Sequence, residues 1–212
     1  MSFQKEVLKR KPTILPIFEK YCDEKKYLFM APVSEIYDYC VLEFSFSFWQ
    51  WGHLADEIPN TNTTDKEIFN YFTKTISPEY FDQTTGRMVL PFFVQALREL
   101  GYYAYNTKPF RRLMQLKDTK GYVEKLFVPK EAQFPYEPEI SILLDRFIRS
   151  NASNILMIYG GNDPWTASSA NIGSNHKVLK IIQRGGCHLT RINTLPDTQN
   201  KLAIDALKNW LN

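Results

Sequence analysis

Residues 154–165 have the sequence NILMIYGGNDPW, and this stretch decides the fold of the carboxyl-terminal part of the chain. Its first six residues form a nearly continuous apolar run, the pattern of a strand buried on both faces of a parallel sheet. Residues 177–182, KVLKII, predict a second strand. Apolar residues at helical spacing predict a helix over residues 137–150 and another over residues 196–211. This alternation of strands and helices indicates the α/β class.

Two strands are too few for a sheet with both faces covered, so strands this apolar imply further strands. Residues 102–105 and 122–128 are the remaining candidates, and both are weak. We therefore expect the sequence to be the end of a larger, incomplete α/β fold.

The first two-thirds of the chain are expected to be mainly helical. Thr64 and Glu67 form a capping box that predicts a helix of about three turns. Ser77 followed by Pro78 predicts the start of a further helix, which Gly101 ends. In residues 42–49, three Phe residues alternate as in a strand, although the flanking residues allow a helix, so both interpretations stay open.

Composition limits the classes of function. The chain has 212 residues and a formal net charge of +3, and its 26 basic and 23 acidic residues form no stripe that predicts a nucleic-acid partner. No segment predicts a membrane span, and charged residues near the start stand where an export signal has its apolar stretch. Cys22, Cys40 and Cys187 lack metal-type spacing, so we expect no metal and no other cofactor. A single bridge between Cys22 and Cys40 stays open.

Two residues carry the predicted chemistry, and each follows a strand across a glycine turn. Asp163 follows the first strand, and His188 lies 25 residues later, after the second. Ligand and catalytic groups of parallel sheets sit at the carboxyl ends of strands. An imidazole near neutrality can take a hydroxyl proton and return it, and a buried carboxylate holds it in the required tautomer.

Structural interpretations compete with this one. An Asp before Pro is a common helix cap, and a single His near a terminus is usually structural. Cys187 could also pair with His188, although neighbouring side chains of an extended loop point apart.

The segments YGGNDPWTASSA (residues 159–170) and GGCHLTRI (residues 185–192) resemble the acid and histidine loops of the bacterial secreted serine tripeptidyl-aminopeptidases, distant relatives of the lysosomal Pro-Xaa carboxypeptidases. The stretches LEFSFSFWQWG (residues 42–52) and LGYYAYNTKPF (residues 100–110) resemble other parts of that family, so the similarity spans most of the chain. The resemblance implies a carboxyl-terminal portion of an α/β-hydrolase, with Asp163 as the triad acid.

By the same resemblance His188 is the general base, residues 1–130 form a mainly helical cap, and residues 131–212 belong to the hydrolase domain. The sequence departs from the family in one respect, because none of its nine glycines builds a G-x-S-x-G nucleophile elbow. We therefore expect this chain alone to be inactive.

Substrate contacts and partners follow from the same comparison. An aminopeptidase needs a carboxylate for the free amine of its substrate, and Glu43 is the candidate, although an ordinary solvated or paired Glu is the simpler interpretation. Trp165, in the NDPW motif, is a second candidate substrate contact. The expected partners are a peptide substrate and an amino-terminal half that carries the Ser nucleophile.

Two other interpretations stay open: a non-catalytic peptide-binding module, and one half of a split hydrolase. Localisation is also open, since the resemblance implies a secreted or periplasmic protein and the amino terminus shows no export signal.

Overall fold

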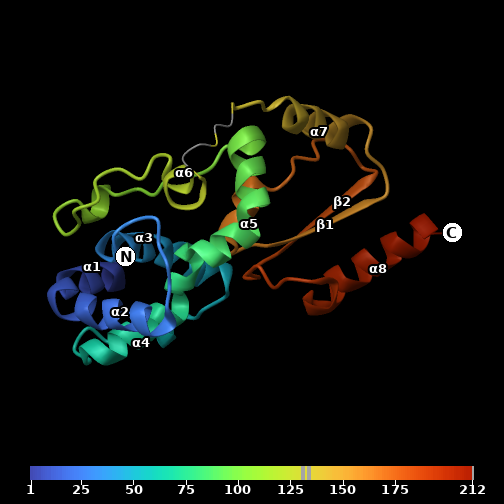
Figure 1. Cartoon of the computed structure of the whole chain (residues 1–212). Coiled ribbons are helices and arrows are strands. Elements are labelled where there is room, and N and C mark those ends of the chain that lie inside the picture. Colours follow the sequence, from blue (N-terminus) through green and yellow to red (C-terminus); the bar gives the residue numbers. More distant parts are fainter. Residues whose placement is uncertain (130–131, 133–134, 212) are drawn as a thin grey trace. The chain divides into compact units, whose positions relative to one another are not determined.

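The structure is a computed structural model, and it describes residues 1–129, 132 and 135–211. The chain divides into two compact units, which we call the helical unit (Met1–Ser47 and Leu54–Glu137) and the sheet unit (Phe48–His53 and Pro138–Asn212). The domain boundary expected between residues 130 and 131 lies outside the described residues. Figure 1 colours the chain by residue number.

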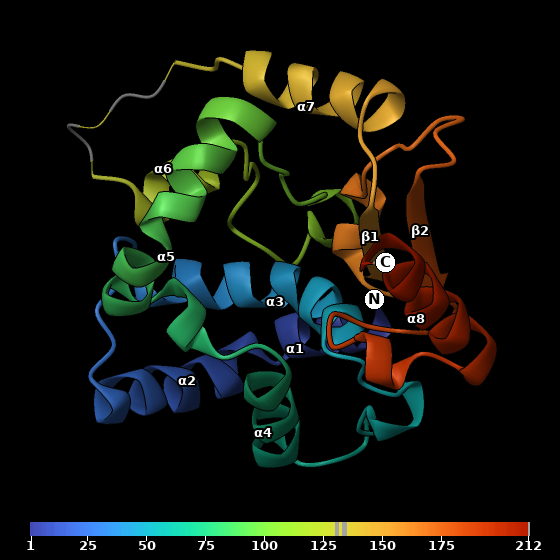
Figure 2. The same cartoon turned by 90° about the vertical axis from the view of Figure 1, so that its right-hand side faces the viewer.

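The described helices of the helical unit are α1 (Ser2–Lys9), α2 (Lys11–Lys25), α3 (Val33–Gln50), α4 (Asp65–Thr75), α5 (Gln83–Gln95) and α6 (Tyr122–Phe127). Helices α1 to α4 lie together (Figures 1 and 2). The ambiguous residues 42–49 are helical and belong to α3. That helix is buried around most of its circumference, so its apolar residues carry no helical period for a sequence pattern to detect. Residues 122–127 form α6, so the weak strand candidate there was wrong.

Aromatic rings build the core of the helical unit. Tyr37 makes edge contacts with Phe18, at 5.2 Å between ring centroids, and with Phe72, at 5.6 Å. Such tilted contacts add to the free energy gained by burying the rings. Cys22 and Cys40 are buried and free, so the disulfide left open by the sequence is not formed.

The helix caps are partly those expected. Thr64 and Glu67 form the predicted capping box at the start of α4. Ser77, however, caps only a short 3-10 turn, Pro78–Phe81, and α5 begins later with Asp82 as its cap. At the far end a π-helical turn, Ala96–Leu100, follows α5, and Gly101 ends it at φ 78° as predicted.

The sheet unit contains the predicted strands and helices: α7 (Glu139–Ser150), β1 (Ile155–Gly160), β2 (Val178–Gln183) and α8 (Asp197–Leu211). The strands are parallel, with Ile155 opposite Val178 and Gly160 opposite Gln183. Helix α8 packs on one face of the sheet through Ala203. This residue forms a core cluster with Ile181 and Leu195, against which the partly buried Leu156 and Ile158 pack. In Figures 1 and 2, α7 and α8 lie on opposite sides of the two strands.

The described chain is thus mostly helical, with a small two-stranded parallel sheet that is compatible with part of an α/β fold. Within the described residues, none of the helices has both the length and the apolar content needed to cross a bilayer.

Asp82 is expected to matter more for stability than Ser77. Its carboxylate accepts hydrogen bonds from the backbone N–H groups of Leu28 (2.7 Å) and Thr84 (2.9 Å), and so caps α5 and holds a distant loop. Ser77 accepts one longer bond, 3.3 Å, from Glu79. We expect Asp82→Ala to lower the free energy of unfolding by about 2–3 kcal/mol and Ser77→Ala by less than about 1 kcal/mol. Urea denaturation of both variants measures this, and the reverse order would contradict the assignment of the cap.

Candidate active site

The loops that follow β1 and β2 are bonded to each other through their backbones. The N–H of Gly161 donates to the carbonyl of Gln183 at 2.8 Å, and the N–H of Asn162 donates to the carbonyl of Gly186 at 2.8 Å. Because the strands are parallel and adjacent, both loops leave the same end of the sheet. The side chains that follow the two glycine pairs are therefore brought to one place.

Gly160 is the point of closest approach between the two loops. A Cβ added at this position would lie 2.3 Å from the carbonyl oxygen of Cys187 and 2.7 Å from its backbone nitrogen. Those atoms belong to the backbone and cannot move aside cheaply, so the position accepts glycine alone. Gly160 is thus required because the two loops lie too close together for any side chain at this position.

Asp163 and His188 meet across this junction. The Oδ2 atom of Asp163 lies 2.7 Å from Nδ1 of His188. The Asp163 side chain is 8% exposed and the His188 side chain is 43% exposed. An ionised carboxylate can only accept hydrogen bonds, so this contact requires the proton on Nδ1 and leaves a lone pair on Nε2. The arrangement is able to act as a general base toward a group that reaches Nε2.

Asp163 is also a helix cap, as the competing structural interpretation held. Its Oδ1 accepts a hydrogen bond of 3.1 Å from the N–H of Trp165, at the start of the 3-10 turn Pro164–Ser168. The two carboxylate oxygens thus serve different partners, and the cap fixes the orientation in which Oδ2 faces His188. Trp165 lies at this junction through its backbone, next to the acid.

Three residues besides Asp163 contact His188. The backbone N–H of His188 donates to the carbonyl of Gln50 at 2.8 Å, and the ring of Trp51 makes an edge contact with the imidazole at 5.6 Å between centroids. The guanidinium of Arg191 donates to the His188 carbonyl at 2.9 Å. Gln50 and Trp51 lie far from His188 in the sequence, and the two closely spaced Trp residues of WQWG were the available signal.

Cys187 faces away from this chemistry. Its Sγ would lie 2.9 Å from a Cβ added to Gly52, so it packs against the turn that follows α3. The thiol therefore packs beside Gly52, a glycine with positive φ.

Glu43 belongs to the helical unit, where it is 4% exposed and surrounded by hydroxyl groups. Its carboxylate accepts hydrogen bonds from the hydroxyls of Tyr105 and, at 3.1 Å, of Tyr103. Ser47, one helical turn along α3, donates at 3.5 Å. Burial raises the pKa of Glu43 to about 7, while the hydroxyl donors act in the opposite direction. Glu43 is thus a paired, buried carboxyl group.

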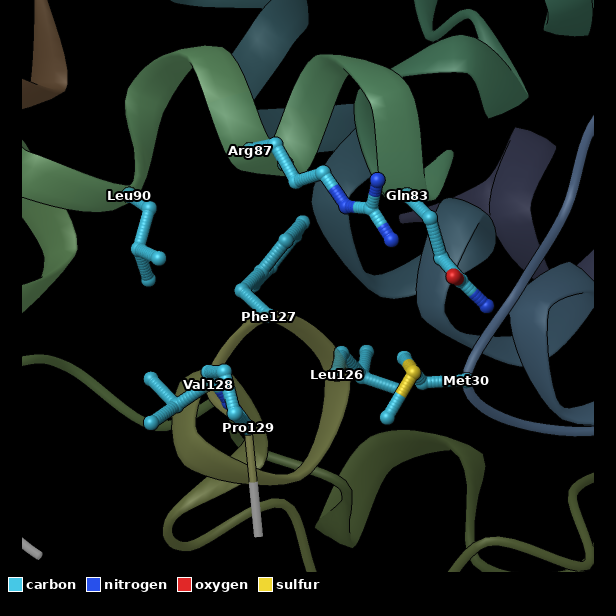
Figure 3. Close-up of a pocket in the computed structure, with 9 residues that line it drawn as sticks. Met30, Gln83, Arg87, Leu90, Leu126, Phe127, Val128 and Pro129 are labelled. Atoms are coloured by element: carbon cyan, nitrogen blue, oxygen red, sulfur yellow. The ribbon is translucent and has the colours of Figure 1, made fainter. Parts of the chain in front are cut away.

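The helical unit also has a hollow of about 310 Å³ between α5 and α6 (Figure 3). Its walls are mostly apolar, and in the figure Phe127 projects toward α5 while Gln83 and Arg87 reach down beside it. The lining residues are Met30, Gln83, Gly86, Arg87, Leu90, Leu126, Phe127, Val128 and Pro129. None of them is an acid, a base near neutrality or a nucleophile, so this hollow has no catalytic group of its own. Among the described residues, no three His, Cys, Asp or Glu side chains are grouped so as to hold a metal ion.

The tautomer of His188 is the first testable consequence of the site. We expect Nδ1–H in the wild-type chain at a pH where the ring is neutral, and a shift to mainly Nε2–H in Asp163→Ala, because the partner that holds the Nδ1 proton is lost. Long-range nitrogen–proton NMR measures this, with His53 and His176 as internal references, since the chain has 3 histidines. Asp145→Ala, which removes an exposed carboxylate of α7, is the control. An Nε2–H tautomer in the wild type would exclude the contact.

The second consequence concerns pH. Because the pKa of Glu43 rises from 4.5 to about 7 on folding, the unfolded chain loses this proton at a lower pH than the folded chain. The contribution of Glu43 to the free energy of unfolding therefore falls as pH rises from about 4.5 to 7 and is constant above. Relative to Glu43→Gln, we expect the wild type to lose about 3 kcal/mol over this range.

Urea denaturation at several pH values measures this difference. Tyr105→Phe removes a hydroxyl donor that lowers the pKa of Glu43. In that variant the pH range over which stability falls should therefore extend to higher pH. Parallel pH profiles for the wild type and Glu43→Gln would show that the carboxyl group is not perturbed.

Comparisons with known proteins place the chain in a family. A model of the family described as PS-10 peptidase S37 matches residues 1–211. A curated relative, the prolyl tri/tetrapeptidyl aminopeptidase of Streptomyces mobaraensis, is 25% identical over 216 residues. The match covers 98% of this chain and 45% of the relative, so the chain spans less than half the length of that protein. No solved structure matches the chain. On the family match, the chain belongs to the PS-10 peptidase S37 family.

Proposed function

We propose that the chain is the acid- and base-bearing carboxyl-terminal part of an α/β-hydrolase-type serine peptidase, whose complete form releases short peptides, such as tripeptides, from amino termini. One observation carries the proposal: the 2.7 Å contact between Asp163 and His188 at the carboxyl ends of adjacent parallel strands. The acid precedes the histidine along the chain, the order found in α/β-hydrolases. The name of the Streptomyces relative supports the reaction and the size of the released peptide.

The proposed reaction is acyl transfer through a serine ester. His188 takes the proton of a serine hydroxyl at Nε2 as the serine oxygen attacks the peptide carbonyl, and then gives that proton to the leaving amine. Asp163 keeps the ring oriented and stabilises the imidazolium. The serine comes from a segment outside this sequence, which has no G-x-S-x-G elbow. Loss of the nucleophile costs about a millionfold in turnover, so the chain alone should be inactive.

Substrate recognition is proposed for two residues and one region. Glu43 is the proposed partner of the substrate's amino group, which would have to replace hydroxyl donors such as Tyr103. Trp165 is the proposed wall beside the acid loop, and residues 1–130 are the proposed cap over the substrate.

The test is complementation. The chain is mixed with the portion of the Streptomyces relative that it does not match, and hydrolysis of a tripeptidyl chromogenic substrate is followed. We expect hydrolysis only in the mixture, and a loss of at least about a thousandfold with His188→Ala. Arg146→Glu, an exposed substitution on α7, is the control for effects of substitution and purification that do not involve His188. Hydrolysis that survives His188→Ala would overturn the base, and peptide binding without turnover would favour a binding module.

A further inference from the structure

Helix α3 ends in a glycine turn, and this turn (Phe48–His53) belongs to the sheet unit together with the loops that follow β1 and β2. The backbone N–H of His53 donates to the carbonyl of Phe48 at 3.1 Å. The N–H of Gly52 donates to the carbonyl of Trp49 at 3.3 Å, and Gly52 has a φ of 74°. These two bonds with a left-handed glycine form a Schellman motif, which closes the last turn of a helix.

The glycine turn is attached to the loop that follows β2 at two points. The last turn of a helix leaves carbonyl groups without a partner inside the helix, and that of Gln50 accepts the backbone N–H of His188 at 2.8 Å. A Cβ added at Gly52 would lie 2.9 Å from Sγ of Cys187, so the absent side chain lets the loop approach. Trp51 lies between these two attachments, and its place beside the loop is therefore set by the backbone.

The indole of Trp51 meets the imidazole of His188. The two ring centroids are 5.6 Å apart and the ring planes are inclined at 76°, an arrangement that stabilises aromatic pairs beyond the apolar area they bury. Trp51 is 48% exposed, so its ring contributes little to the core, where most large apolar side chains lie. The contact with His188 gives this exposed indole a partner in the candidate site.

The imidazole needs such a contact because its side chain has a single hydrogen bond and is half exposed. Nδ1 of His188 lies 2.7 Å from Oδ2 of Asp163. Exposed side chains exchange among staggered rotamers within nanoseconds, and only one orientation of the ring directs Nδ1 to the carboxylate. An indole packed against the ring disfavours the orientations in which the bond to Asp163 is lost.

We infer that Trp51 is a positioning residue for His188, held by the glycine turn of α3 so that its indole keeps the imidazole bonded to Asp163. The inference rests on the proposed function in taking His188 as the base of the reaction. The indole acts through the imidazole, because fixing the ring also fixes the direction of the Nε2 lone pair. A base that is oriented before the substrate arrives is in place for proton transfer.

Solvent exchange of the Nδ1 proton of His188 tests this role on the whole chain, without a substrate. Exchange requires the ring to leave Asp163, so its rate reports the fraction of released imidazole. We expect Trp51→Ala to raise that rate about 3- to 10-fold, the effect of losing one aromatic edge contact. Trp51→Phe, which restores a ring, should bring the rate back to within about twofold of the wild type. Nitrogen–proton NMR at low temperature, at a pH where the ring is neutral, measures the rate.

Trp49→Ala is the matched control. Trp49 is 47% exposed and packs on Phe48 at 5.1 Å between ring centroids, so its loss should leave Nδ1 exchange unchanged. The backbone amide of His188 distinguishes an effect on the ring from an effect on the turn. Its bond to Gln50 should keep the same protection in Trp51→Ala.

Four results would overturn the positioning role: unchanged Nδ1 exchange in Trp51→Ala, no recovery in Trp51→Phe, an equal effect of Trp49→Ala, or loss of protection at the His188 amide. The last of these would assign the indole to the stability of the turn. Because the chain alone is measured, failed complementation would refute the proposed function and leave the ring contact intact. Hydrolysis restored in the mixture, together with unaltered Nδ1 exchange in Trp51→Ala, would refute the positioning role alone.

Discussion

The close approach of two loops at Gly160 is the constraint on which the candidate site depends. With backbone atoms of Cys187 where a side chain would stand, the ends of β1 and β2 can meet only through glycine. The loops are then bonded to each other, and the carboxylate of Asp163 has little freedom besides facing His188, because its other oxygen caps the next turn. The contact between Asp163 and His188 thus follows from backbone packing and one cap.

The sheet unit was largely predictable from the sequence, and the reason is physical. Continuous apolar runs bounded by glycine, and helices with one apolar face, are patterns that a sheet and its covering helices impose directly. The same logic predicted that Asp163 and His188 would follow successive strands. What it could not supply was the support from Gln50 and Trp51, since those contacts join segments that are distant in the chain.

The helical unit was harder to predict because aromatic rings pack around its helices on several sides. Residues 42–49 lie in a helix buried on most sides, which removes the period that separates a helix from a strand. Ser77 before Pro78 does cap a helical segment, but that segment is a single 3-10 turn. Asp82 then caps the start of α5. The tyrosine hydroxyls around Glu43 come from a segment without regular structure, so no sequence periodicity predicted their contact with Glu43.

We propose that this chain supplies the acid and base to a serine held by another segment. Labelling with a fluorophosphonate probe tests that claim most directly. The account predicts no label on the chain alone, and label on a serine of the added segment that disappears with His188→Ala. Label on this chain by itself, or labelling indifferent to His188, would contradict it.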